Sequence, residues 1–369
     1  MNSPATELKL FERLRTINEG GEDPRDIISE INSALQHNLN MRSTLGEKGI
    51  CEIISNTFEY AAPNSANTCL ELLKIVYNLC CDGDFPNSEF CIENIVSFGL
   101  TGVCKSIVWC IQKYVRNEEC VLHGCIAIRA LAYDSAQNQE YLFTVGACEV
   151  LSGVLVSFSD NLAVCEASCW AIMGLSYHDD IASRFGELGV CKSLYDLLKQ
   201  SIHLRVFHEE YSKVVTAALW ATRNLAAINN LNLNIFDDLG IPDVLLSILI
   251  LSDSGGLLSE KLYESICGAL GGLCYDDKLA STIGSNGLGN LILEKGKQFI
   301  ENEKIGMVLS EVVRNLTACE DPEENIRLLM DAQGAELLMS LLEKHLKNSI
   351  ICVMSCRALG NFSLVDDCR

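Results

Sequence analysis

Apolar residues recur at helical spacing along most of the chain, and one arrangement of them returns again and again. The segment 214–228, VVTAALWATRNLAAI, shows it clearly, because at 100° per residue its side chains divide into two faces. The small or apolar face consists of Val214, Ala218, Thr222 and Leu225. The opposite face consists of Trp220, Arg223 and Asn224. The pattern predicts an α-helix with one side in a core and the other displayed to solvent.

The same unit is marked out by glycines that precede predicted helix starts at intervals of 43 to 51 residues. These glycines are Gly49, Gly99, Gly146, Gly189, Gly240, Gly287 and Gly334. A Leu or Phe follows each glycine about thirty residues later, in an apolar helix: Leu79, Leu131, Leu175, Leu225, Leu273, Leu316 and Phe362. Repeats of about this length, built from two or three helices, are typical of HEAT and armadillo arrays. We therefore expect an all-α fold, a right-handed α-solenoid in which each unit packs on its neighbours.

The first part of the chain does not carry the repeat. Apolar residues at helical spacing predict one helix over 4–18 and a second over 26–37, separated by Gly20 and Gly21. Terminal units of a solenoid shield the core from solvent. The sequence thus predicts an N-terminal helical cap over residues 1–38 and a single repeat array over residues 39–369.

The last helix of each unit has a recognisable pattern, seen in CWAIMGLSYH from Cys169, ICGALGGLCYDD from Ile266, EVVRNLTACED from Glu311 and CRALGNFSLVDD from Cys356. This pattern resembles the armadillo family over about residues 40–369, in about seven repeats. The resemblance implies that the third helices line a concave groove, in which ladder asparagines bind the backbone of an extended peptide. The matching positions are Asn78, Asn224, Asn315 and Asn361. In the other units this position holds Ala130, Gly174 or Gly272.

Tryptophan and arginine side chains complete the predicted partner-binding groove. The tryptophans are Trp170 and Trp220. The arginines, which precede the ladder position, are Arg129, Arg223, Arg314 and Arg357. Guanidinium groups suit carboxylates and phosphates because they form bidentate hydrogen bonds, as in armadillo proteins of the catenin kind. The alternative is that each arginine pairs with an Asp or Glu on a neighbouring repeat.

The net charge of −21, from 49 acidic and 28 basic residues, limits the chemical classes of partner that we expect. A strongly acidic surface repels phosphate backbones and anionic lipid, so we expect no nucleic-acid binding and no membrane insertion. Basic proteins or peptides are favoured by the overall charge, although the same charge also serves to keep a long helical array soluble. The sequence leaves the choice between an acidic and a basic ligand open.

Nineteen cysteines fall largely on apolar helix faces, without the pattern of a disulfide framework. They favour a reducing compartment, the cytoplasm or the nucleus, and the N-terminal residues show no signal peptide. The sequence predicts no catalytic, cofactor or metal site. The trio Cys120, His123 and Cys125 lacks a fourth ligand, and the segment from His208 to Ser212 lacks the second histidine of a zinc-protease motif.

We therefore expect a non-enzymatic scaffold or adaptor that binds an extended segment of a partner protein in its groove. One alternative is a regulator of a folded partner, such as an exchange factor for a small GTPase or a myosin chaperone; ALGGLCYDD from Ala269 resembles the Smg type of exchange factor. A nuclear import receptor is less favoured. Importin-α proteins pair Trp with Asn in several consecutive repeats, whereas only Trp220 and Asn224 do so here.

Overall fold

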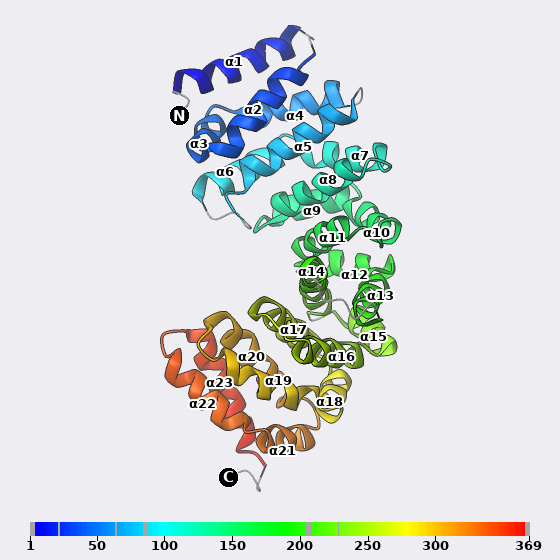
Figure 1. The fold of residues 1–369 in the computed structure, drawn as a ribbon, viewed down its shortest axis with the longest axis vertical. Helices are drawn as coiled ribbons and strands as arrows, with labels where there is room; N and C mark the ends of the chain where they lie inside the picture. The colour runs from blue at the N-terminus through cyan, green and yellow to red at the C-terminus, as the bar shows by residue number, and fades with distance from the viewer. Residues whose placement is uncertain are drawn as a thin grey trace. The chain divides into compact units, whose positions relative to one another are not determined.

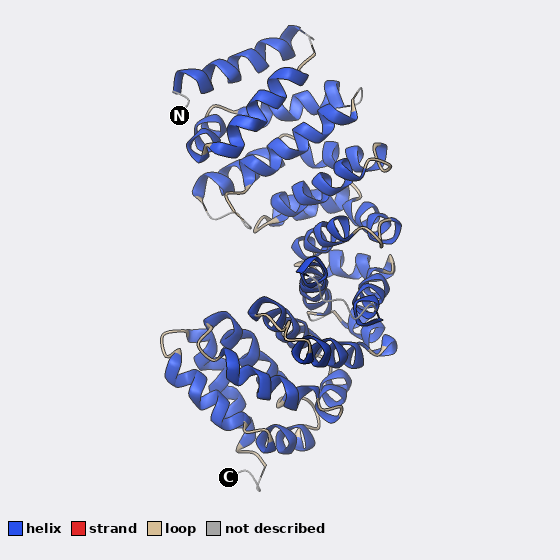
Figure 2. Cartoon of the chain, in the orientation of Figure 1, coloured by secondary structure: helices blue, strands red, loops and turns tan. Residues whose placement is uncertain are grey.

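The computed structural model describes residues 4–20, 23–62, 65–83, 88–203, 209–227 and 229–365. The described residues form helices joined by short loops, and none of them forms a β-strand (Figure 2). Contacts divide the chain into two compact units, residues 1–175 and 176–369. The predicted division into a cap over 1–38 and one array over 39–369 stays a prediction.

Unit 1 contains eleven helices within its described residues (Figure 1): α1 Pro4–Gly20, α2 Arg25–His37, α3 Leu39–Glu47, α4 Ile50–Ala61, α5 Ala66–Cys80, α6 Glu89–Leu100, α7 Val103–Lys113, α8 Glu118–Ala132, α9 Ala136–Thr144, α10 Ala147–Ser157 and α11 Leu162–Leu175. After the α1–α2 pair, they run in triplets of a short first helix, a second helix and a third helix. The triplets are α3–α5, α6–α8 and α9–α11. The third helices pack side by side in the order α5, α8, α11, and α2 packs on α5 as a third helix would.

Unit 2 repeats this triplet in its described residues: α12 Asp179–Glu187, α13 Val190–His203, α14 Glu209–Ala226, α15 Asn230–Leu239, α16 Ile241–Ser254, α17 Glu260–Leu273, α18 Asp277–Ser285, α19 Leu288–Gly296, α20 Glu303–Leu316, α21 Glu323–Asp331, α22 Gly334–Lys344 and α23 Ser349–Phe362. A 3₁₀ turn, η2 Lys297–Phe299, follows α19. Its third helices α14, α17, α20 and α23 pack in that order.

Each second helix begins directly after a residue with a left-handed backbone, where φ lies between 64° and 88°. Glycine suits this conformation because it has no Cβ to clash. The residues are Gly49, Gly102, Gly146, Gly189, Gly240, Gly287 and Gln333. The sequence-based choice of Gly99 and Gly334 was therefore wrong. Gly99 lies inside α6, and Gly334 is the first residue of α22, where Gln333 takes the left-handed position at φ 64°.

Four buried asparagines lock successive first helices together. Their Nδ2 groups donate to backbone carbonyls, and Asn138 of α9, for example, donates to Ile95 O of α6 at 3.0 Å and to Leu131 O of α8 at 2.9 Å. Each asparagine Oδ1 lies against a glycine of the preceding first helix, where an alanine Cβ would come within 1.8 to 2.2 Å of it. The pairs are Gly46–Asn94, Gly99–Asn138, Gly186–Asn232 and Gly284–Asn325. Glycine is thus required for close approach at Gly99, rather than for a turn.

The predicted two faces of the 214–228 helix are confirmed over its described residues. Val214, Ala218, Thr222 and Leu225 are at most 2% exposed, whereas Trp220, Arg223 and Asn224 are partly exposed. The cysteines also behave as predicted, because every described cysteine is a free thiol and only Cys352 and Cys356 reach the surface.

Within the described residues, no single helix is long and apolar enough to cross a membrane. Two helix pairs, α6 with α7 and α9 with α10, reach that length and composition only together, and they are bent by 77° and 75°.

Candidate functional site

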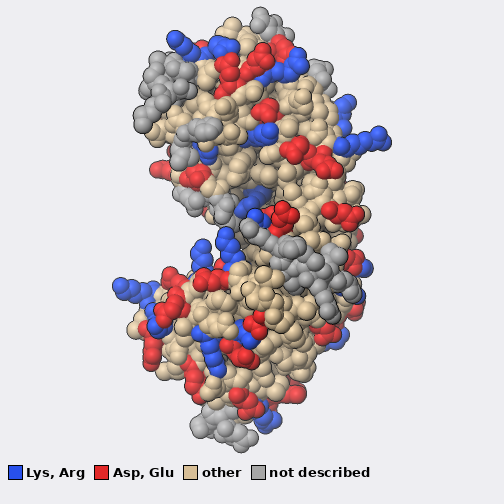
Figure 3. Space-filling view, in the orientation of Figure 1, with Lys and Arg blue, Asp and Glu red and all other residues tan. Residues whose placement is uncertain are grey.

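The candidate site is the displayed side of the third helices, here called the ladder face. In unit 2 it is formed by α14, α17, α20 and α23, and it carries seven of the ten predicted site residues. They are Trp220, Arg223, Asn224, Arg314, Asn315, Arg357 and Asn361. Figure 3 shows basic and acidic side chains interspersed over the surface of unit 2 in that view. Local pairing therefore decides which charges remain available to a partner.

Three glycines on one side of α17 leave a strip of backbone without side chains in the middle of this ladder face. The strip consists of Gly268, Gly271 and Gly272. An alanine Cβ at Gly272 would lie 2.7 Å from Arg223 O, so this glycine lets α17 approach α14 closely. The indole of Trp220 packs over Gly268, where a Cβ would lie 2.8 Å from the ring. The glycine that replaces a ladder asparagine at position 272 thus has a packing reason.

Arg223 is held by an ion pair that passes over this strip. Its Nη2 donates to Glu311 Oε2 of α20 at 2.8 Å, and its guanidinium also lies 5.4 Å from the Trp220 ring centre. Glu311 lies against Gly271, where a Cβ would approach its carboxyl carbon to 3.2 Å. Both side chains of the pair are mostly buried. Arg223 is therefore paired within the chain, although its partner lies one repeat beyond the neighbouring repeat that the alternative interpretation named.

The ladder asparagines hydrogen-bond across neighbouring third helices. Asn315 donates through Nδ2 to Gly271 O at 2.9 Å, and Asn361 donates to Thr317 Oγ1 at 3.2 Å. Asn315 is only 3% exposed. These amides fix the register of adjacent repeats, a role that the sequence-based prediction of peptide contacts did not include.

Two arginines at the α20–α23 end differ from Arg223, since neither forms an ion pair with any residue in the described ranges. Arg314 donates to Asn315 Oδ1, and Arg357 is exposed and pairs with none of the described residues. These two guanidinium groups therefore have no neutralising carboxylate among the described residues.

Glu264 of α17 is a half-buried carboxylate on the same face. Burial raises its pKa above the usual value, and the neighbouring Lys304, Arg223 and Lys261 oppose that effect. It has no hydrogen-bond or ion-pair partner among the described residues. The sequence-based prediction did not include Glu264 or Glu311. A search for acidic residues on the displayed side of the third helices could have identified both.

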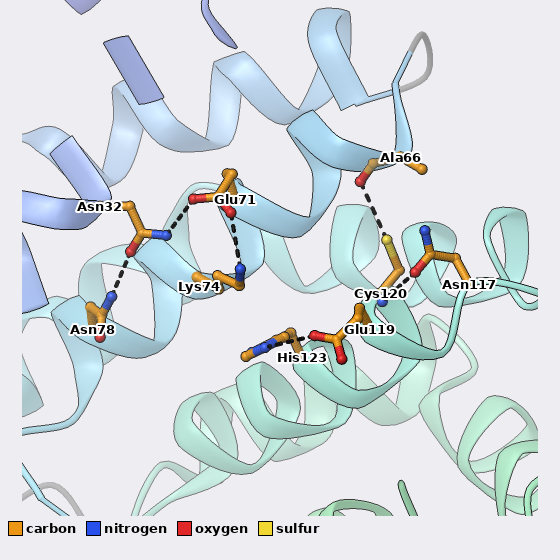
Figure 4. Close-up of polar contacts among 9 residues, drawn as sticks. All are labelled: Asn32, Ala66, Glu71, Lys74, Asn78, Asn117, Glu119, Cys120 and His123. Carbon is orange, nitrogen blue, oxygen red and sulfur yellow. Dashed lines mark hydrogen bonds and ion pairs between the residues drawn. The ribbon is translucent and has the colours of Figure 1, made fainter. Parts of the chain in front are cut away.

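In unit 1 the ladder face is formed by α5, α8 and α11, with α2 packed on α5. Figure 4 shows the polar contacts that join Asn32, Glu71, Lys74 and Asn78. Asn78 of α5 donates to Asn32 Oδ1 of α2 at 2.6 Å, and Asn32 in turn donates to Glu71 Oε2 at 2.7 Å. Lys74 extends this hydrogen-bond network with a 3.0 Å ion pair to Glu71. Asn78 is thus joined to its neighbouring helix, as Asn315 is in unit 2.

Arg129 of α8 and Trp170 of α11, which the sequence predicted separately, come together in unit 1. The guanidinium lies 4.9 Å from the indole centre, within the range of a cation–π contact. Gly174 lies beside them, and a Cβ there would be 3.6 Å from Ala132 Cβ. The indole face that could receive a cationic side chain from a partner is occupied by an arginine of this chain.

The trio Cys120, His123 and Cys125 lies on α8, and no group of three or more potential metal-binding side chains occurs among the described residues. Cys120 Sγ contacts Ala66 O at 3.3 Å, and His123 Nε2 lies 3.7 Å from Glu119 Oε2. Burial lowers the pKa of His123 and raises that of Cys125 to about 12, so both favour their neutral forms. His208, the first residue of the incomplete zinc-protease motif, lies outside the described residues, because 204–208 are not described.

Comparisons with known proteins agree with the repeat geometry. No model of a known protein family matches the chain. Over 245 residues, 65% of this chain, the sequence is 20% identical to Armadillo repeat-containing protein 6 of Homo sapiens. The match spans 39% of the length of that curated relative.

Solved structures match a larger share of the chain. A designed armadillo repeat protein in complex with the peptide (KR)4 superposes with a TM-score of 0.55 and 18% identity, over 70% of this chain and 99% of that one. The chain has the armadillo-repeat fold. An engineered protein matches this armadillo array with a TM-score of 0.74 and 16% identity, over 96% of this chain and 78% of that one.

A third structure, from work on a phosphorylation switch between cadherin and beta-catenin, matches the armadillo array with a TM-score of 0.65 and 15% identity. It covers 93% of this chain and 58% of that chain. The predicted all-α fold class, an armadillo-type α-solenoid, is thus confirmed.

Proposed function

We propose that this protein is a non-enzymatic scaffold that binds an extended segment of a partner protein on the ladder face. A protein-interaction role is supported by the fold, since structures that share it include an armadillo protein carrying a bound peptide. The roles of all ten predicted site residues, the exchange-factor, myosin-chaperone and import-receptor alternatives, and a cytoplasmic or nuclear location stay predictions.

The local charge at the α20–α23 end supports a partner segment with carboxylates or phosphates. Arg314 and Arg357 display guanidinium groups there, while Arg223 is neutralised by Glu311 and Arg129 stacks on Trp170. Guanidinium groups bind carboxylates and phosphates through charge-assisted hydrogen bonds. This single observation, two arginines with no carboxylate partner among the described residues, carries the choice of an acidic over a basic segment.

A random library of 15-residue peptides displayed on phage tests the proposal. Peptides selected on the wild-type protein should be rich in Asp, Glu or both, and they should bind the Arg314→Gln/Arg357→Gln variant at least tenfold more weakly. The matched control is Arg327→Gln, which removes a surface arginine paired with Glu323 on α21. This control should leave binding unchanged.

Selection of basic peptides would contradict the proposed ligand chemistry. Equal binding by the wild type and by the Arg314→Gln/Arg357→Gln variant would contradict the proposed location of the site.

A further inference from the structure

An apolar stripe runs along the exposed side of α6, a first helix of unit 1, away from the ladder face. Its residues are Ile92, Val96 and Leu100, which are 49%, 47% and 70% exposed. Positions i, i+4 and i+8 share one helix face, so the stripe extends over roughly 12 Å. Tyr141 of α9, itself 38% exposed, lies close to its end, because its hydroxyl is 4.0 Å from where a Cβ would stand at Gly102.

The other first helices of this chain provide an internal comparison. The stripe lies ten, six and two residues before the left-handed residue Gly102, and the same three positions can be read in every triplet. They hold Leu39, Ser43 and Glu47 in α3; Ala136, Glu140 and Thr144 in α9; Asp179, Ser183 and Glu187 in α12; Asn230, Asn234 and Asp238 in α15; Asp277, Ser281 and Ser285 in α18; and Glu323, Arg327 and Asp331 in α21. The fold therefore accepts polar residues at these positions, and packing does not require the apolar ones in α6.

Carboxylates accompany the stripe. Glu89 and Glu93 are exposed on the same side of α6, and Glu140 is exposed on the adjacent α9; the exposed bases on neighbouring segments include Lys48 beyond α3 and Lys105 on α7. A second copy docking on this stripe would bring like charges together, and an anionic membrane would be repelled in the same way. The charge pattern instead fits a partner that carries positive charge beside an apolar face.

We propose that the α6 stripe docks an amphipathic helix of a partner protein, with Lys or Arg beside its apolar residues. The i, i+4 ridge of α6 would pack into the groove between the side-chain ridges of that helix, and Glu89 and Glu93 would pair with its basic residues. This interaction surface uses no residue of the ladder face.

A labelled 18-residue Leu/Lys amphipathic helix is the probe, and its Leu/Glu counterpart with the same leucine spacing is the charge control. Fluorescence anisotropy at physiological salt should show binding of the Leu/Lys peptide to the wild type. Binding should be at least tenfold weaker for the Val96→Ser/Leu100→Ser variant and unchanged for Val156→Ser, which alters a 64% exposed valine on α10. Because the substituted side chains are exposed, the variants should keep the wild-type circular dichroism and urea midpoint.

A second variant, Glu89→Gln/Glu93→Gln, should weaken Leu/Lys binding while leaving the apolar stripe intact. In hydrogen exchange, the bound peptide should slow the amides of α6. Equal peptide binding by the wild type and Val96→Ser/Leu100→Ser would overturn the proposal, as would equal binding of the Leu/Glu peptide.

Two other outcomes would assign the stripe to a different occupant and also overturn the proposal: stripe-dependent dimerisation in sedimentation, or stripe-dependent binding to vesicles containing phosphatidylserine. The acidic peptides selected on the ladder face should bind Val96→Ser/Leu100→Ser as tightly as wild type. Failure of this proposal is therefore distinguishable from failure of the proposed function.

Discussion

Substituting alanine for Gly99 probes the contact that joins successive first helices. The new Cβ would lie 1.8 Å from Asn138 Oδ1, which is far inside contact distance. Asn138 is 1% exposed and donates to Ile95 O and Leu131 O, so it has no free space to enter. The side chain must rotate away and break its hydrogen bonds, or α6 and α9 must separate.

The expected loss of stability follows from opposing effects. Alanine gains about 1 kcal/mol over glycine inside a helix. Overpacking costs about 1–3 kcal/mol, and leaving buried hydrogen-bonding groups unsatisfied costs about 1–3 kcal/mol. Gly99→Ala should therefore lower the free energy of unfolding by roughly 1–5 kcal/mol.

Gly153→Ala on α10 is the matched control, because this exposed helical glycine has no atom within 4 Å of the Cβ position. It should stabilise the protein by about 0.5–1 kcal/mol. Urea unfolding followed by circular dichroism measures both effects, and hydrogen exchange should show faster opening of α6 and α9 in Gly99→Ala alone.

A double-mutant cycle with Asn138→Ala isolates the contact itself. Once the asparagine is removed, Gly99→Ala should cost little, which gives a coupling free energy of about 1–3 kcal/mol. The reasoning is refuted if Gly99→Ala stabilises the protein as much as Gly153→Ala does.

Three further predictions concern other parts of the chain. Gly272→Ala should destabilise unit 2 because its Cβ would lie 2.7 Å from Arg223 O; an unchanged urea midpoint would count against this. In thiol titration of the folded protein with Ellman's reagent, Cys352 and Cys356 should react quickly, whereas the buried thiols should react only after unfolding. One further cysteine lies outside the described residues, so more than three fast-reacting thiols per chain would contradict this prediction. Burial raises the pKa of Glu264 in the folded state, so the folded state holds its proton more tightly than the unfolded state and stability is lost as pH rises through that pKa. Glu264→Gln should thus raise Tm at pH 7 and change it little at pH 4, and a lowered Tm at pH 7 would contradict this.

The periodicity of apolar residues was sufficient to predict the helices and which face of each helix is buried. In the 214–228 segment, the 3.6-residue period separated the buried Val214 and Leu225 from the displayed Trp220 and Arg223. The period works because burial of one helix face is a local requirement that every repeat must meet.

The sequence alone did not identify which glycine precedes each second helix, because two glycines three residues apart have different structural roles. In the α6 region, Gly99 allows close approach of Asn138 and Gly102 adopts φ 80°. Both appear in the sequence as helix-terminating glycines. Only the packing between triplets distinguishes them.

The pairing of Arg223 was also beyond sequence reasoning. Its partner Glu311 is 88 residues away in the sequence. Glu311 lies on α20, whereas the third helix that follows α14 is α17. The contact exists because Gly268, Gly271 and Gly272 leave α17 without side chains on that side. A prediction limited to adjacent repeats could not identify this pair.

Hydrogen exchange with a selected acidic peptide bound tests the central claim most directly. The account predicts slower amide exchange in α20 and α23, and loss of that protection in the Arg314→Gln/Arg357→Gln variant. Protection confined to first or second helices, with α20 and α23 unchanged, would contradict the claim that the ladder face binds the partner.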